Sequence, residues 1–184
     1  MRRFAQFAIL LSLAACSGAP PADLYVVQAA PGAVVTTRPI GLELRRIGLA
    51  GYLDRPEIVR GPRDYRLSVE ANAKWAEPLG RMLGRVLTED LVQRLPNAAV
   101  IAESGAISTR PDLVLEVDIQ RLDLDSDGSL VLLAQTALRP DGGTAQVRTL
   151  RLVVPDVGPG AAGQAEAISR VMGALADRVA GEVR

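Results

Sequence analysis

Three carboxylates near the middle of the chain could together provide general acid and base catalysis. Asp54 and Glu57 precede a short apolar run, and Glu77 follows further along. Two carboxylates act together as acid and base only at a defined distance from each other, and nothing in the sequence fixes the distances between these three. The chain also contains no histidine, the side chain most often used for proton transfer near neutral pH. We therefore interpret the three as helix-capping and solvated loop residues, and expect no catalytic residues and no enzyme.

A second acidic group resembles the first half of a calcium-binding loop. Asp123, Asp125, Asp127 and Gly128 match the pattern D-x-D-x-D-G. The twelfth position of such a loop is a bidentate glutamate, whereas this chain has Ala134, inside a predicted strand. We therefore predict an acidic turn without a metal.

Residues 158–163 match the G-x-G-x-x-G pattern of dinucleotide-binding loops. That motif also needs a second parallel strand after its helix, and the sequence ends with the helix, so we expect a flexible connection and no cofactor. The formal net charge is zero and no cluster of Lys and Arg is present. A nucleic-acid partner is therefore not expected.

The first residues have the layout of a signal peptide. Arg2 and Arg3 precede an apolar run over 4–15, which is shorter than the roughly 20 residues that a membrane-spanning helix needs. The sequence Leu-Ala-Ala-Cys at 13–16 resembles the lipobox of bacterial lipoproteins, in which the signal is cut before the cysteine and the cysteine carries the lipid. Cys16 is the single cysteine of the chain. The alternative is an ordinary signal peptide near a free thiol.

These features divide the chain into three parts. We predict a signal peptide over 1–15, a lipidated tether over 16–23, which is small and rich in proline, and one domain over 24–184. Several acyl chains on Cys16 would hold the protein stably on a membrane. An aspartate after the lipidated cysteine resembles a signal for retention in the inner membrane, so Ser17 in that place points to the outer membrane.

The hydrophobic pattern predicts the elements of the domain. Apolar stripes of helical period occur over 77–95, with Arg94 on the polar side, and over 165–183. Alternating or apolar runs predict strands over 24–27, 40–49, 65–71, 98–101, 113–124, 130–138 and 145–154. In 65–71 the apolar set beginning at Tyr65 is expected to be buried. We predict a single α+β domain in which a mostly antiparallel sheet of about six strands is packed by two amphipathic helices.

The stretch from Tyr52 to Leu79 holds the only tryptophan and two of the three tyrosines. Its first part, YLDRPEIV, predicts a turn that leads into a strand, because Pro56 favours an extended conformation at Arg55. Its last part, WAEPL, predicts the start of a helix, because Pro78 is tolerated in a first turn.

These two segments are similar to motifs of the PqiC-like lipoproteins, auxiliary components of ABC-type and MCE-type envelope lipid transport systems. The similarity rests on Tyr52, Leu53, Asp54, Arg55, Pro56, Ile58 and Val59 in the first motif and on Trp75, Ala76, Glu77, Pro78 and Leu79 in the second. Lys74 stands where the family pattern leads us to expect arginine, which keeps the charge but loses the bidentate donor.

The resemblance implies a non-enzymatic lipoprotein on the periplasmic face of the outer membrane, held there by acylated Cys16. Its partners would be an MCE-domain protein that bridges the envelope and the inner-membrane transport components, and related proteins suggest a homo-oligomeric ring. We hypothesise that the partner or self-association surface comprises Tyr52, Leu53, Asp54, Arg55, Pro56, Trp75, Glu77 and Pro78, because proline-stiffened loops with aromatic and arginine side chains suit interfaces. The alternatives are a stand-alone structural or assembly lipoprotein and a lipid-binding carrier.

Overall fold

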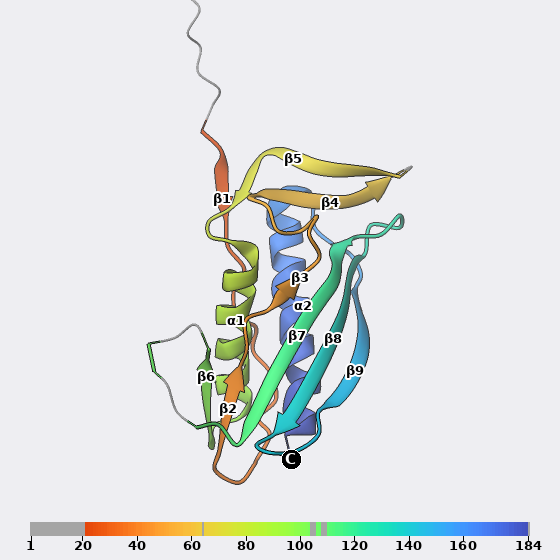
Figure 1. The fold of residues 1–184 in the computed structure, drawn as a ribbon. Coiled ribbons are helices and arrows are strands. Elements are labelled where there is room, and N and C mark those ends of the chain that lie inside the picture. Colours follow the sequence, from red (N-terminus) through yellow and green to blue (C-terminus); the bar gives the residue numbers. More distant parts are fainter. Residues whose placement is uncertain (1–20, 64, 104–105, 108–109, 184) are drawn as a thin grey trace, which may run out of the picture.

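The computed structural model describes residues 21–63, 65–103, 106–107 and 110–183 (Figure 1). The predicted signal peptide and Cys16 lie outside these residues. The elements, in chain order, are β1 (Asp23–Tyr25), β2 (Ile40–Leu44), β3 (Gly48–Leu49), β4 (Glu57–Arg63), β5 (Arg66–Trp75), α1 (Leu79–Arg94), β6 (Ala98–Ala102), β7 (Leu113–Leu124), β8 (Leu130–Pro140), β9 (Gln146–Val154) and α2 (Gly160–Glu182). Within the described residues, neither helix is long and apolar enough to cross a membrane.

The larger sheet has the strand order β6-β2-β7-β8-β9, and β3 also pairs with β7. Its two longest pairings are antiparallel, because the acidic turn at 125–128 joins β7 and β8 directly and a short turn joins β8 to β9. The other pairings, β2 with β6 and with β7 and β3 with β7, are parallel. The predicted strand over 40–49 is divided, because three residues, 45–47, lie opposite only two residues of β7.

The two helices cover one face of this sheet (Figure 1). Their apolar stripes meet the inward side chains of β2, β7 and β8 in one core, whose largest fully buried members include Leu42, Met82, Leu83, Leu87, Leu91, Leu115 and Ile119. The predicted single α+β domain is confirmed: most of the residues that lie in helices or strands belong to the strands.

Helix α2 begins at Gly160, five residues earlier than expected, so the glycine-rich segment is not a flexible connection. The segment instead supplies the first turn of the helix. A Cβ at Gly163 would collide with the backbone of Gly158, so this close approach requires glycine. The glycine-rich composition of 158–163 predicts a loop, because composition carries no information on the close packing of Gly163 against Gly158.

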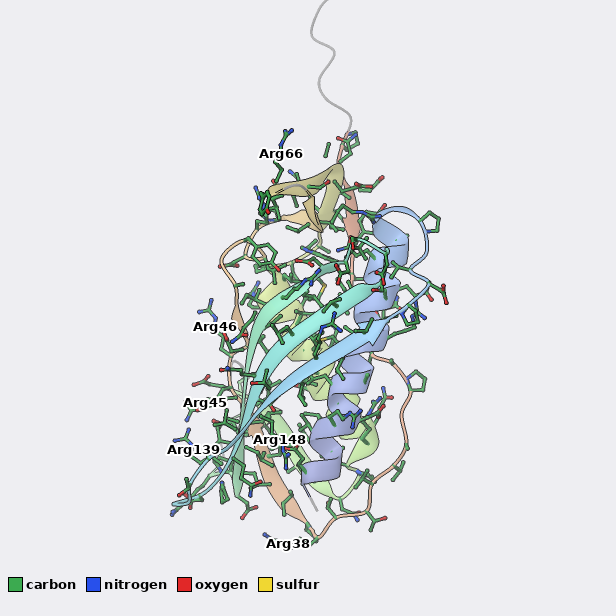
Figure 2. All side chains as sticks on the ribbon, turned by 90° about the vertical axis from the view of Figure 1, so that its right-hand side faces the viewer. Arg38, Arg45, Arg46, Arg66, Arg139 and Arg148 are labelled. Carbon is green, nitrogen blue, oxygen red and sulfur yellow. The ribbon has the colours of Figure 1, made fainter. Side chains whose placement is uncertain are left out.

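The smaller sheet has the order β1-β5-β4, with β1 parallel to β5 and the hairpin β4–β5 antiparallel. The alternation over 65–71 correctly predicted a strand, but the expectation that one face would be buried is wrong. Tyr65 is fully exposed, Leu67 is 41% exposed and Val69 is 39% exposed, since no element of the described part of the chain covers these side chains. Arg66, next to Tyr65, lies at the end of the molecule where the chain enters the fold (Figure 2).

Arg94 is also placed differently from the prediction, because its side chain is only 1% exposed between the two helices. Its guanidinium donates to the carbonyl oxygens of Ala30 and Gly173, both at 3.1 Å, and forms an ion pair with Asp177 of α2. Its own carbonyl oxygen accepts the Val35 N–H at 2.7 Å. Arg94 therefore joins the connection between β1 and β2 to both helices.

Asp90, one turn earlier in α1, is fully buried beside Arg94. Its Oδ1 atom accepts the Ala30 N–H at 2.8 Å and lies 3.5 Å from the Arg94 guanidinium, while Oδ2 finds no hydrogen-bond donor among the described residues. Burial raises the pKa of Asp90 from 3.8 to about 6.

This raised pKa makes the stability of the fold depend on pH. The folded state keeps a proton on Asp90 at pH values where the unfolded state has released it, so proton binding stabilises the fold. This contribution to the free energy of unfolding is complete below about pH 4 and is lost as the pH rises through about 6. The loss is about 3 kcal/mol. Asp90→Asn keeps an acceptor for the Ala30 N–H but cannot ionise. Between about pH 4 and pH 7 we expect the wild-type free energy of unfolding to fall by about 3 kcal/mol relative to that of D90N, as measured by urea denaturation. Parallel pH profiles for the two proteins would contradict this assignment.

Candidate functional site: a cleft between two loops

The two sequence motifs meet at a cleft of about 380 Å³. One side comes from the turn before β4, and the other comes from the end of β5 and the start of α1. The lining residues are Asp54, Arg55, Pro56, Trp75, Ala76, Glu77, Pro78 and Leu79. Segments that are distant in the sequence therefore form one concave surface.

Backbone hydrogen bonds hold the two sides of the cleft together. The Trp75 N–H donates to the Pro56 carbonyl oxygen at 2.8 Å, and the Ala76 N–H donates to the Tyr25 carbonyl oxygen at 2.9 Å. The Pro78 carbonyl oxygen accepts the Arg81 and Met82 N–H groups, and α1 begins directly after Pro78, so the predicted helix start in this segment is confirmed. The cleft is thus attached to β1, β5 and α1 and is built into the fold.

The floor of the cleft is apolar, and its rim is charged. Trp75 and Leu79 are buried, whereas Asp54, Arg55 and Pro56 are exposed. Arg55 pairs with Glu57 at 3.0 Å, and Glu77 pairs with Arg85 at 2.9 Å. An apolar pocket with a charged rim suits the binding of a protein side chain or another small apolar group.

The carboxylates around the cleft are poorly suited to proton transfer. The hydrogen bond from Arg55 lowers the pKa of Glu57, whereas a catalytic acid needs a raised one. Glu77 is likewise paired with a cation. Both side chains are thus held in ion pairs at the surface. The helix-capping part of our interpretation is wrong, because α1 begins after Pro78 without a side-chain cap and Glu57 lies in β4.

Tyr52 and Leu53 attach the first loop to the domain and do not face outward from the cleft. The Tyr52 hydroxyl donates to Asp123 Oδ2 at 2.6 Å, and Leu53 is 2% exposed. Burial raises the pKa of Tyr52. With Trp75 at 6% exposure, three of the residues proposed for an interaction surface are inward anchors, because the loop needs apolar groups in the core to keep its shape.

The acidic residues of the calcium-like pattern have protein partners. Asp123 is 2% exposed and accepts hydrogen bonds from Tyr52 and Arg121, and Asp127 accepts the Ser129 N–H and hydroxyl. Among the described residues, no group of three or more acidic, His or Cys side chains is arranged to hold a metal.

Two residues that join β4, the strand after the first loop, to α2 were not predicted from the sequence. Gln164 is buried at the start of α2, where its amide nitrogen donates to the Val59 carbonyl oxygen at 2.6 Å. Arg60 donates to the Gly160 carbonyl oxygen at 2.7 Å. No local pattern could have found this pair, because the residues they join are about a hundred positions apart in the chain.

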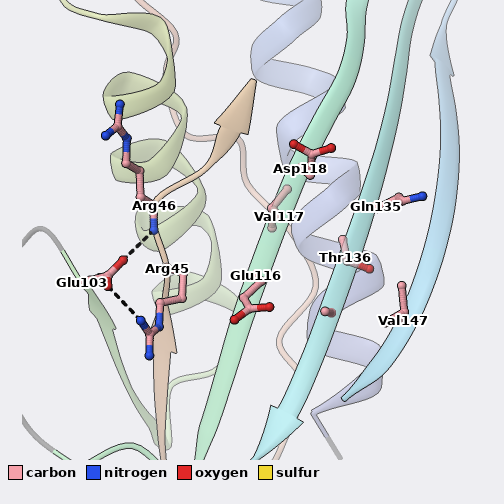
Figure 3. A pocket seen from close by; sticks show the side chains of 10 residues that line it. Arg45, Arg46, Glu103, Glu116, Val117, Asp118, Gln135, Thr136 and Val147 are labelled. Carbon is pink, nitrogen blue, oxygen red and sulfur yellow. Dashed lines mark hydrogen bonds and ion pairs between the residues drawn. The ribbon is translucent and has the colours of Figure 1, made fainter. Parts of the chain in front are cut away.

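A larger concavity of about 480 Å³ lies on the face of the sheet that the helices leave uncovered (Figure 3). Its charged residues are at least partly exposed, and three of their side chains are already paired. Glu103 accepts hydrogen bonds from the Arg45 side chain at 3.0 Å and from the Arg46 N–H at 3.1 Å, and Glu116 accepts one from Arg139 at 2.7 Å. No sequence motif converges on it. We therefore assign the candidate site to the cleft between the motif loops.

Comparison with known proteins identifies the family. The family model described as the ABC-type transport auxiliary lipoprotein component matches residues 24–180. Among solved structures, the chain is similar to an uncharacterised protein, with a TM-score of 0.75 and 18% identity over 89% of this chain and 99% of that one. It is also similar to protein XCC0632 from Xanthomonas campestris, with a TM-score of 0.66 and 20% identity over 86% of this chain and 93% of that one.

A PelC dodecamer from Paraburkholderia phytofirmans gives a TM-score of 0.46 at 14% identity, over 82% of this chain and 93% of that one. No curated protein sequence matches the chain. The first two structures show that the fold is shared, and the family match spans nearly the whole predicted domain. The chain therefore belongs to the family of ABC-type transport auxiliary lipoprotein components.

Proposed function

We propose that this protein is a non-enzymatic auxiliary lipoprotein of an ABC/MCE-type intermembrane lipid transport system. It is anchored by acylated Cys16 to the periplasmic face of the outer membrane, where it docks the MCE-domain protein that bridges the envelope. The family match over residues 24–180 carries the proposal. The homo-oligomeric ring that the resemblance implies stays a prediction.

Two features of the chain support this role. The family description names an auxiliary part of a transporter, which implies a supporting role without catalysis. The lipobox-like sequence ending at Cys16 and the Ser17 that follows it support the anchor and its location.

The cleft is the part of the surface that we assign to the MCE-domain partner. Its exposed rim residues, Asp54 and Arg55, present opposite charges beside an apolar floor at Trp75 and Leu79. Interfaces concentrate their binding energy in such buried apolar centres, and charged rims set the orientation of the partner.

An affinity pull-down from gently solubilised envelopes tests the proposal. We expect a tagged chain to recover an MCE-domain protein. We expect Arg55→Glu to reduce that recovery about tenfold, since reversing a rim charge sets like charges against each other, and a loss of about 1.4 kcal/mol in binding free energy is a tenfold loss of affinity. Arg110→Glu is the matched control, because Arg110 is an exposed arginine far from the cleft in the sequence and also forms an ion pair.

Cys16→Ala separates the anchor from the docking surface. If Cys16→Ala no longer recovers the partner, assembly needs the lipid. If Arg55→Glu and Arg110→Glu recover the partner equally well, docking at the cleft is contradicted. Recovery of only wall or outer-membrane assembly proteins would favour the stand-alone structural alternative.

A further inference from the structure

The hairpin β4–β5 carries several exposed apolar side chains. Leu67 and Val69 alternate along β5 and therefore lie on one side of the strand. Tyr65 lies in the turn just before β5, at φ 61°, and all three side chains are substantially exposed. A contiguous exposed apolar patch on a small domain generally marks a contact surface.

The opposite face of the hairpin lies against the end of β7. This contact determines which way the exposed apolar side chains point. Ser68 and Glu70 line a groove with Leu124 and Pro159. Gly61, paired with Ser68, is buried at φ 132°, and a Cβ there would collide with the Leu124 carbonyl oxygen. Because the Ser68 side faces the end of β7, the side of β5 that carries Leu67 and Val69 faces away from the domain. Tyr65, in the turn beside it, is fully exposed.

The patch lies at the end of the molecule where the chain enters the fold. In Figure 1, β5 crosses the same end at which β1 begins, and β1 pairs with β5 from Asp23 onward. Leu24, at 67% exposure, and Val26, at 46%, add apolar surface beside the hairpin. The segment from Cys16 to Asp23 can span at most about 25 Å, so a lipid on Cys16 would keep this end close to the bilayer.

We propose that the outward face of β4–β5 rests on the phospholipid surface and acts as a second, non-covalent membrane contact. This inference rests on the lipid anchor of the proposed function. Tyrosine favours the interface between headgroups and acyl chains because its ring is apolar and its hydroxyl is polar. Arg66, exposed beside Tyr65 (Figure 2), can bind lipid phosphate groups. The contact would fix the orientation of the domain, with the larger sheet extending away from the membrane.

The test uses the full lipidated protein reconstituted into vesicles of phosphatidylethanolamine and phosphatidylglycerol. Because acylation occupies the thiol of Cys16, Tyr65→Cys introduces a single site for an environment-sensitive fluorophore. Val147→Cys is the matched control: Val147 is 64% exposed, and it lies at the start of β9, near the opposite end of the larger sheet. We expect a headgroup-linked nitroxide lipid to quench the label at position 65 at least about twofold more strongly than the label at 147, since an interfacial side chain lies within the headgroup region.

Each outcome decides the inference. Equal quenching at the two positions in protein that floats with the vesicles would overturn the membrane contact and leave the anchor intact. Failure of the protein to float with the vesicles would contradict both the membrane contact and the lipid anchor. A label at position 65 that is shielded from the nitroxide but transfers energy between copies of the chain would overturn the inference in favour of self-association through this face.

Discussion

Replacing Arg94 with methionine is expected to lower the free energy of unfolding by about 3–5 kcal/mol, the usual consequence of removing one partner from a buried ion pair. The side chain is 1% exposed and contacts Asp90, Asp177 and the carbonyl oxygens of Ala30 and Gly173. Methionine has similar length but no donors, so these oxygens would stay buried without hydrogen bonds. Gly32 packs so closely on the guanidinium that a Cβ there would collide with it, which shows how little room exists for rearrangement.

Arg110→Met is the matched control for this experiment. Arg110 forms an ion pair with Asp141 at 2.7 Å, but its side chain is 85% exposed, and such surface pairs contribute at most about 1 kcal/mol. Thermal unfolding should show a fall in Tm of about 10 °C for R94M and little change for R110M. Equal melting temperatures for the two variants would show that the buried cluster does not stabilise the fold as described.

Trp75→Ala is expected to lower the free energy of unfolding by about 3–5 kcal/mol, because the change removes the floor of the cleft and leaves a cavity in the core. Trp75 is 6% exposed, and its backbone N–H joins β5 to the turn before β4 at Pro56. Urea denaturation followed by circular dichroism measures the effect without relying on the fluorescence of the tryptophan that is lost.

Tyr65→Ala provides the contrast, because Tyr65 is an aromatic residue of the same hairpin that is fully exposed. We expect a change within about 0.5 kcal/mol. If the two variants were equally stable, Trp75 would not be a core residue. The expected result also means that loss of a partner in a Trp75 variant would be ambiguous, so the binding experiment uses the exposed Arg55.

Periodic patterns predicted the helices and the longest strands because those signals are local. The stripe from Leu79 to Leu95 lies in the core as expected. The same pattern placed Arg94 on the polar side, since a hydrophobicity pattern cannot show that a second helix covers that side. Alternation likewise identified the face of β5 that contains Leu67 and Val69, but whether a face is covered depends on distant elements.

The cleft shows a similar division between what was predictable and what was not. The motifs identified both loops, and the structure brings them together. The sequence could not distinguish inward from outward residues, so Leu53 and Trp75 were grouped with the exposed Arg55. The hydrogen bonds of Arg60 and Gln164, which join β4 to the start of α2, depend on a contact between distant parts of the chain.

The parallel pairing of β1 with β5 has a mechanical consequence. A pull on the amino-terminal end acts first on β1, and its hydrogen bonds to Ala73–Trp75 would be loaded together in shear, since the strands are parallel and the force runs along them. Behind β1, Asp90 and Arg94 fasten Ala30 and Val35 to the helices. Tension that passes along the chain from this end would therefore meet two successive attachments before it reached the turn that carries Arg55.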